Sequence, residues 1–326
     1  DMLSGSGHIT VKADLALTLN ANVDVTTAST GTISLDAEGG TLTMDGSVNV
    51  KADGSSLRVA ASGDIVLGNL TGTNVSVITS GGAIVNADDT TKNVTATNLR
   101  LEADDAIGES DRHLTLNVST VTANSMGTDS TGIYLTEDNA ITVDTVSVTV
   151  TDFNADASTT DVTDASQSDL ISDNGGNIVL VAKLGNITLN DGTDVSVPSA
   201  EDNTDGTAVS ADDIGSILID ALAGSVVVNS DILSGSGHIT LKAGTSMNLN
   251  TGVDVKTASA GTISLDAEDG ALTMHGTVKV EASTSSLRVA ASGNIVLGNL
   301  TATNVSVITS GGAITNAAGT SKNVTA

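Results

Sequence analysis

Residues 31–35 read Gly-Thr-Ile-Ser-Leu, and residues 261–265 repeat the same five residues without a change. A glycine followed by alternating apolar and polar residues is typical of a turn that leads into a short β-strand. Val, Ile and Thr are frequent along the whole sequence, and no apolar stripe with helical spacing is sustained in it. The motif therefore predicts an all-β chain.

The same motif recurs with small variations throughout the sequence. It begins at Gly7, Gly31, Gly63, Gly176, Gly185, Gly215, Gly237, Gly261 and Gly293. Several spacings are about 20–24 residues, the length of one solenoid coil, so we predict a right-handed parallel β-helix solenoid. A string of β-sandwich modules is the alternative. It is disfavoured because the chain has only two aromatic residues, Tyr134 and Phe153, to anchor sandwich cores.

A longer repeat encloses the short one. Residues 1–96 align without a gap with residues 231–326, and 71 of these 96 positions are identical. We therefore predict one continuous solenoid over 1–326, with a long tandem repeat over 1–230 and the start of the next over 231–326. Because Ala326 corresponds to Ala96, where the first copy continues without a break, we expect the parent protein to extend past both ends.

The two copies indicate which side of a strand faces the core. Residues 46–52 read GSVNVKA, and the equivalent residues 276–282 read GTVKVEA. The valines and the alanine are kept, whereas the residues between them change, including Lys51 to Glu281. Kept and changed positions alternate with a period of two, which predicts a strand with one packed face and one solvated face.

Charge and composition exclude several classes of protein. The chain has a formal net charge of −27, with 12 Lys and Arg against 39 Asp and Glu, which argues against binding nucleic acid or an anionic membrane. No apolar stretch approaches the length of about 18 residues needed to span a membrane. The lack of cysteine excludes disulfides, thiolate metal sites and cysteine nucleophiles.

The middle of the long repeat, residues 129–213, is rich in acid and poor in the repeated motif. Two stretches, 152–173 and 191–213, contain many Ser, Thr and Asp residues, so we expect loops that project from the solenoid. Clustered carboxylates can bind calcium, but neither an EF-hand spacing nor a Gly-Gly-x-Gly-x-Asp repeat is present, and solvated acid explains these residues better. We therefore predict no defined metal site. If calcium binds, the candidate ligands are Asp161, Asp164, Asp202, Asp205, Asp212 and Asp213.

No pattern in the sequence predicts catalysis. The histidines, His8, His113, His238 and His275, lack the convergent partners of a metal or acid–base site, so we interpret them as surface or turn residues. Enzymes with a β-helix fold collect acids and bases in one groove, whereas the acids of this chain gather in its expected loops. We therefore expect a protein that is not an enzyme and needs no cofactor, with calcium as the one candidate ion.

Two segments carry a resemblance to a known family. Residues 62–70, SGDIVLGNL, and 79–84, TSGGAI, with the repeated motif, resemble the filamentous-haemagglutinin-like proteins of Gram-negative bacteria. The resemblance is clearest over 1–110 and 215–326, and it rests on a repeat pattern rather than on a catalytic signature. It implies a β-helical secreted adhesin or surface filament, and it carries over no functional residue.

The resemblance and the repeats together lead to one functional expectation. We expect a non-catalytic, structural stalk segment of a giant secreted adhesin or extracellular filament at the bacterial cell surface. Its expected partners are further repeats of the same chain, and copies of itself in a fibre or sheath. The alternative is a repeat module for cell adhesion that binds surface glycans or neighbouring cells through its acidic loops, with calcium.

Overall fold

The computed structural model describes residues 1–88, 90–127, 132–193, 206–320 and 322–326. These residues form β-strands and turns, and no helix occurs among them, so the prediction of an all-β chain is confirmed. The chain divides into two compact units. The first unit comprises Asp1–Leu135, Thr145–Ser168 and Thr193–Ser196, and the second comprises Thr136–Asp144, Asp169–Gly192 and Val197–Ala326.

Strands of the first unit are short at its beginning and longer towards its end. They are β1 (Met2–Ser4), β2 (Ile9–Ala13), β3 (Leu17–Leu19), β4 (Asp24–Thr27), β5 (Ile33–Ala37), β6 (Leu42–Met44), β7 (Asn49–Ala52), β8 (Ser56–Ala61), β9 (Ile65–Leu67), β10 (Asn69–Thr71), β11 (Asn74–Thr79), β12 (Ile84–Asn86), β13 (Val94–Ala103), β14 (Leu114–Ser125), β17 (Val146–Phe153) and β18 (Thr159–Gln167). Strand β15 (Gly132–Glu137) begins in this unit and ends in the second.

The second unit repeats the same kinds of strand. They are β16 (Ile141–Val143), β19 (Leu170–Ser172), β20 (Asn177–Ala182), β21 (Ile187–Leu189), β22 (Thr207–Ala211), β23 (Ile217–Ala221), β24 (Val226–Val228), β25 (Asp231–Ser234), β26 (Ile239–Ala243), β27 (Met247–Leu249), β28 (Asp254–Thr257), β29 (Ile263–Ala267), β30 (Leu272–Met274), β31 (Lys279–Ala291), β32 (Ile295–Leu297), β33 (Asn299–Thr309), β34 (Ile314–Asn316) and β35 (Val324–Thr325).

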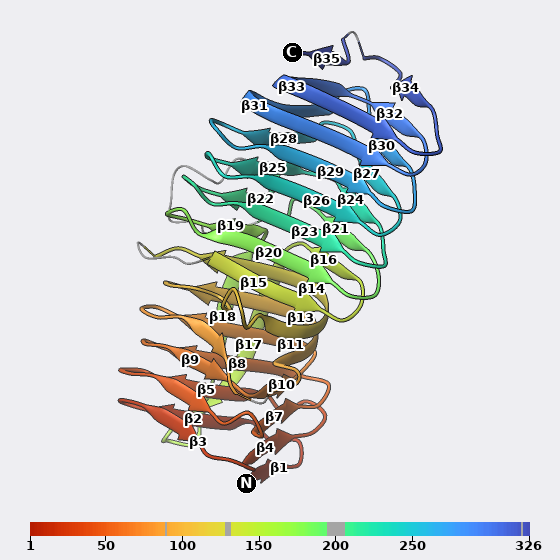
Figure 1. The fold of residues 1–326 in the computed structure, drawn as a ribbon. Helices are drawn as coiled ribbons and strands as arrows, with labels where there is room; N and C mark the ends of the chain where they lie inside the picture. The colour runs from red at the N-terminus through yellow and green to blue at the C-terminus, as the bar shows by residue number, and fades with distance from the viewer. Residues whose placement is uncertain (89, 128–131, 194–205, 321) are drawn as a thin grey trace. The chain divides into compact units, whose positions relative to one another are not determined.

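Within each unit, strands pair in parallel with strands about three places away in the chain (Figure 1). In the first unit one ladder runs β2–β5–β8–β11–β13–β14, a second runs β1–β4–β7–β10–β13 and a third runs β3–β6–β9–β12. The second unit has the equivalent ladder β20–β23–β26–β29–β31–β33. Parallel pairing puts chemically similar residues of successive motifs side by side.

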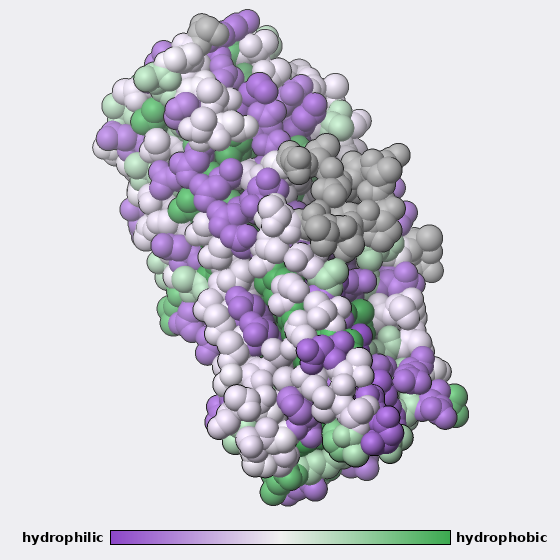
Figure 2. Space-filling view, turned by 180° about the vertical axis from the view of Figure 1, so that it is seen from behind, coloured by the Kyte–Doolittle hydropathy of each residue, from purple (hydrophilic) through white to green (hydrophobic). Residues whose placement is uncertain are grey.

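The core consists of apolar columns that run along these ladders. Leu35, Val59, Val77 and Leu101 are neighbours in register on successive strands, and each is fully buried. The alternation expected from the sequence is confirmed in β7, where Val50 and Ala52 are buried and the residues beside them are exposed. Figure 2 shows mainly hydrophilic and neutral residues on the visible face, with hydrophobic residues in small separate groups.

Polar residues form a column of their own in the second unit. The side-chain Nδ2 of Asn229 donates to Oδ1 of Asn190 at 2.7 Å, and the side chain of Asn250 donates to that of Asn229 at 2.5 Å. Stacked asparagines satisfy each other's amide groups at every step, as in other stacked parallel strands. These hydrogen bonds tie successive turns of the chain together outside the apolar core.

Several motif glycines lie where two stretches of backbone approach closely. In the second unit, a Cβ atom added to Gly261 would lie 1.9 Å from the carbonyl oxygen of Gly237, and one added to Gly237 would lie 2.0 Å from that of Gly215. These three glycines do not have a left-handed φ, so space rather than backbone conformation excludes a side chain here. At these positions the Gly-x-Ile motif marks the points where one layer of chain rests on the layer before it.

Replacing one such glycine tests this explanation. Gly261→Ala should lower the free energy of unfolding by about 1–3 kcal/mol, because the added methyl group must push the Gly237 backbone away. Urea unfolding of the purified chain measures this loss. Gly5→Ala is the matched control, since nothing lies within 4 Å of a Cβ atom there. Equal effects of the two substitutions would contradict the explanation.

Candidate functional site

Strands β17 and β18 form an antiparallel hairpin that belongs to the first unit. Its tip is closed by the backbone N–H of Asn154, which donates to the carbonyl oxygen of Ser158 at 2.9 Å. The carboxylate of Asp156 accepts hydrogen bonds from the hydroxyl and N–H of Ser158, and these bonds lower the pKa of Asp156. The expectation that 152–173 projects as a loop is therefore wrong, because the stretch contains the end of β17, the whole of β18 and the whole of β19. The same expectation for 191–213 is wrong at β22, and residues 194–205 of that stretch lie outside the described residues.

The hairpin is amphipathic. Along β17, Val146, Val148, Val150 and Asp152 are buried, whereas Ser147 and Thr149 between the valines are exposed. On the exposed side, the hydroxyls of Thr149 and Thr163 are hydrogen-bonded at 2.8 Å across the two strands. Three valines and a carboxylate of β17 are therefore buried, a combination that needs both apolar cover and a cation beneath it.

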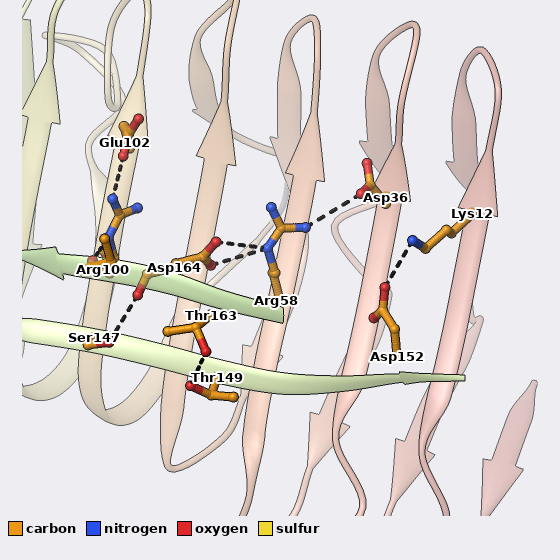
Figure 3. A network of polar contacts seen from close by, with 11 residues as sticks. Lys12, Asp36, Arg58, Arg100, Glu102, Ser147, Thr149, Asp152, Thr163 and Asp164 are labelled. Atoms are coloured by element: carbon orange, nitrogen blue, oxygen red, sulfur yellow. Dashed lines mark hydrogen bonds and ion pairs between the residues drawn. The ribbon is translucent and has the colours of Figure 1, made fainter. Parts of the chain in front are cut away.

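The buried side of the hairpin lies against the outer face of one parallel ladder. Strand β17 contacts β2, β5, β8, β11, β13 and β14, and it crosses them instead of joining them (Figure 3). The outward-pointing residues in one column of this face are Thr10, Ser34, Arg58, Ser76, Arg100 and Thr122. Ser34 is only 1% exposed although it points away from the core. We call this face the seat of the hairpin.

Arg58 is the central charge of the seat. Its Nε lies 3.0 and 3.2 Å from the two carboxylate oxygens of Asp164 on β18, and its Nη1 lies 3.5 Å from Oδ2 of Asp36 on β5 (Figure 3). The side chain of Asp164 is 7% exposed and that of Arg58 is 16% exposed, so solvent screens this pair little. The pair joins the hairpin to a residue 106 positions away in the sequence.

A second ion pair lies towards the tip of the hairpin. Nζ of Lys12 is 2.9 Å from Oδ2 of Asp152, whose side chain is 5% exposed. The hydrogen bond to Asp152, together with the negative charges of Asp152, Asp36 and Glu38, raises the pKa of Lys12 above its ordinary value of 10.5. The lysine is therefore held in its charged form beside a buried carboxylate.

Hydrogen bonds fix the backbone of the hairpin at both ends of the seat. The hydroxyl of Thr32 donates to the carbonyl oxygen of Thr151 at 3.0 Å and accepts from the N–H of the same residue at 2.9 Å. At the other end, Nε of Arg100 donates to the carbonyl oxygen of Ala165 at 3.1 Å, and the side-chain Nε2 of Gln167 donates to the backbone carbonyl oxygen of Leu101 at 2.8 Å. The Thr32 and Arg100 contacts use the hairpin backbone, whereas the Gln167 contact uses a buried side chain of the hairpin.

The candidate calcium ligands do not come together in the described structure. Asp164 is paired with Arg58, and Asp161 accepts a hydrogen bond from the Thr151 hydroxyl at 2.8 Å on the exposed side. Asp212 and Asp213 follow β22, whereas Asp202 and Asp205 lie outside the described residues. Among the residues that the structure describes, no group of three or more His, Cys, Asp and Glu could hold a metal ion.

Two of the histidines take part in hydrogen bonds between layers, whereas His275 bonds to the hydroxyl of Thr277, two residues away. Nδ1 of His8 lies 2.9 Å from the hydroxyl of Thr32, and Nδ1 of His238 lies 2.9 Å from that of Thr262, the equivalent pair in the second copy. One groove of about 620 Å³ in the second unit is bordered by glycine, threonine, lysine and asparagine, with no carboxylate or histidine among its described lining residues. This groove offers no pair of groups for acid–base chemistry.

Comparisons of the chain with family models, with curated proteins and with solved structures found no match. None of the described segments forms a helix long and apolar enough to cross a membrane. The description of the site therefore rests on its own geometry.

Sequence reasoning missed the residues of the seat. Lys12, Asp36 and Arg58 were not given a role, because their partners are far apart in the sequence, and Asp152 of the hairpin was assigned to a projecting loop. One signal was present. Lys12, Asp36 and Arg58 are identical to Lys242, Asp266 and Arg288 in the second copy, although they point away from the core.

Breaking the central ion pair should loosen the hairpin. Asp164→Asn should lower the free energy of opening of 146–167 by about 1.5–3 kcal/mol, because the Arg58 guanidinium loses a charged acceptor. Hydrogen exchange of the hairpin amides measures this change. Asp161→Asn, on the exposed side of the same strand, is the control and should leave exchange nearly unchanged. Protection that survives Asp164→Asn would show that apolar contacts alone hold the hairpin.

Lys12 should make stability depend on pH in the alkaline range. Because its folded-state pKa is raised, its contribution is complete below 10.5 and is lost as the pH rises through the raised value. The difference in urea stability between the wild type and Lys12→Met should therefore be constant up to about pH 9 and should shrink above about pH 10.5. Lys51→Met, at an exposed pair with Asp53, is the control. A difference that is independent of pH would refute the role of Lys12.

Proposed function

We propose that the chain is a right-handed parallel β-helix solenoid, and that it acts as a non-catalytic, structural stalk of a giant secreted cell-surface adhesin or extracellular filament. The observation that carries the proposal is the parallel register within each unit. Ile217, Ile239, Ile263 and Leu287 follow one another in a single column, as do Leu35, Val59, Val77 and Leu101. Columns of this kind can be lengthened by adding further repeats, which is what an elongated stalk requires.

The proposed mechanism is mechanical. In a β-helix the backbone hydrogen bonds between coils run along the long axis, and each coil adds about 4.8 Å of length. A force along that axis is therefore resisted by the hydrogen bonds and the apolar columns together. Each coil also covers the strand edge of the next coil. The proposed partners are further repeats of the same chain, and copies of the chain packed side by side in a fibre or sheath.

The surface supports this role in salty water outside a cell. The net charge of −27 and the hydrophilic and neutral residues of the visible face keep such stalks soluble (Figure 2). The glycan-binding alternative needs free acidic loops in this region. The stalk is favoured over it because Asp164 is paired with Arg58 and because residues 146–167 pack against a ladder of the first unit. Calcium has no part in the proposed mechanism.

A binding assay separates the stalk from an adhesive module. The purified chain should show no saturable binding to glycan arrays or to intact cells, with or without calcium. In a second experiment, single molecules stretched between two handles should unfold in discrete force peaks. A Gly/Ser linker of equal length is the control for stretching and should give none. Saturable binding that disappears in the Asp164→Asn variant or on removal of calcium would overturn the proposal in favour of the module.

A further inference from the structure

The second unit has an open groove on its outer face. The groove has a volume of about 320 Å³ and lies over β29, β31 and β33. Thr262, Ser264, Arg288 and Ser306 line it with their outward-pointing side chains. Counted back by 230 residues, these four are Thr32, Ser34, Arg58 and Ser76, which belong to the seat of the hairpin.

The groove in the second unit is therefore the counterpart of the seat in the first unit, but it carries no hairpin among the described residues. Within residues 1–96, the part of the repeat that is present in both copies, five seat residues take part in the polar contacts of the seat and hairpin, and all five have an identical residue in the second copy. The identical pairs are Thr10 and Thr240, Lys12 and Lys242, Thr32 and Thr262, Asp36 and Asp266, and Arg58 and Arg288.

Outward-pointing residues elsewhere in the repeat are kept less completely. Thr26 becomes Lys256, Asn49 becomes Lys279 and Lys51 becomes Glu281, whereas Asp24, Thr43 and Asn69 are identical to their counterparts in the second copy. Exposed positions carry little structural constraint, so substitutions accumulate there readily. Complete identity at the five contact positions of the seat is what a contact common to both copies predicts.

The side chains of the groove are left partly unburied and underpaired. The Arg288 side chain is 47% exposed, against 16% for Arg58. Among the described residues, Arg288 pairs with Asp266 at 2.8 Å, and no carboxylate takes the place that Asp164 has on Arg58. Ser264 is half-buried, whereas its counterpart Ser34 is buried.

We propose that this groove is the docking site of a β-hairpin of the same pattern as 146–167, supplied by the repeat that follows. In a chain that continues the repeat, the offset of 230 residues between the two copies places this hairpin at positions 376–397. One of its carboxylates pairs with Arg288, a second pairs with Lys242, and its inward valines cover the serines of the groove. The inference depends on the duplication and holds whether or not the protein is a stalk.

A lengthened chain tests the proposal directly. A second copy of residues 97–168 is added after Ala326, which corresponds to Ala96, so that the added segment continues the repeat. The chain has no cysteine, so Ser264→Cys provides a single thiol in the groove. Its reaction with a maleimide should be at least about tenfold slower in the lengthened chain than in the 326-residue chain.

Two controls separate the hairpin from the added coils. A chain lengthened only by residues 97–144 lacks the hairpin and should leave Ser264→Cys reactive. Ser34→Cys, covered by the native hairpin, should react slowly in every chain and reports that the protein is folded. Arg288→Asp should restore fast reaction in the lengthened chain, and changing the added copy of Asp164 to arginine should then slow it again.

Two results would overturn the proposal. The first is fast reaction of Ser264→Cys in the lengthened chain while Ser34→Cys stays protected, because a folded protein would then leave the groove open. The second is protection of Ser264→Cys in the original chain as its concentration rises, because a second copy would then be the occupant.

Discussion

Parallel pairing between successive turns of the chain is the constraint on which the rest of this structure depends. Ile9 pairs with Ile33, and Ile239 pairs with Ile263, in both cases with a residue 24 positions away. A strand paired in this way needs an apolar residue at each position where its neighbours have one. It needs glycine where the backbones of two turns are in contact. The buried columns and the Gly237–Gly261 contact are two results of the same spacing.

Much of this could be predicted from the sequence, because it is local and repeated. The Gly-x-Ile-x-Leu motif predicts turn and strand together, and comparison of 46–52 with 276–282 separates buried from exposed positions. The hairpin was missed for a physical reason. Its alternation, Val146-Ser-Val-Thr-Val-Thr, is present in the sequence, but the abundance of Ser, Thr and Asp after it outweighed that signal. No local rule identifies Arg58, 106 residues earlier, as the partner of Asp164.

The hairpin changes the meaning of the acidic middle of the repeat. Asp152 and Asp164 are not surplus charge, because each meets a cation of the seat, and burial under the valines strengthens these pairs. Other acids of the same segment, such as Asp156 and Asp161, remain at the surface and bond to neighbouring hydroxyls. One composition thus serves two purposes, and only the three-dimensional arrangement distinguishes them.

The crossing direction of β17 has a further consequence. Strands in a stacked ladder contact only their nearest neighbours, so such a ladder can fray from its end one layer at a time. By touching strands from β2 to β14, the hairpin links layers that otherwise have no contact with each other. Loss of any one of these layers then costs contacts with the hairpin as well as with its own neighbours. The hairpin thus couples the layers beneath it, so that these layers are expected to unfold together as one cooperative unit.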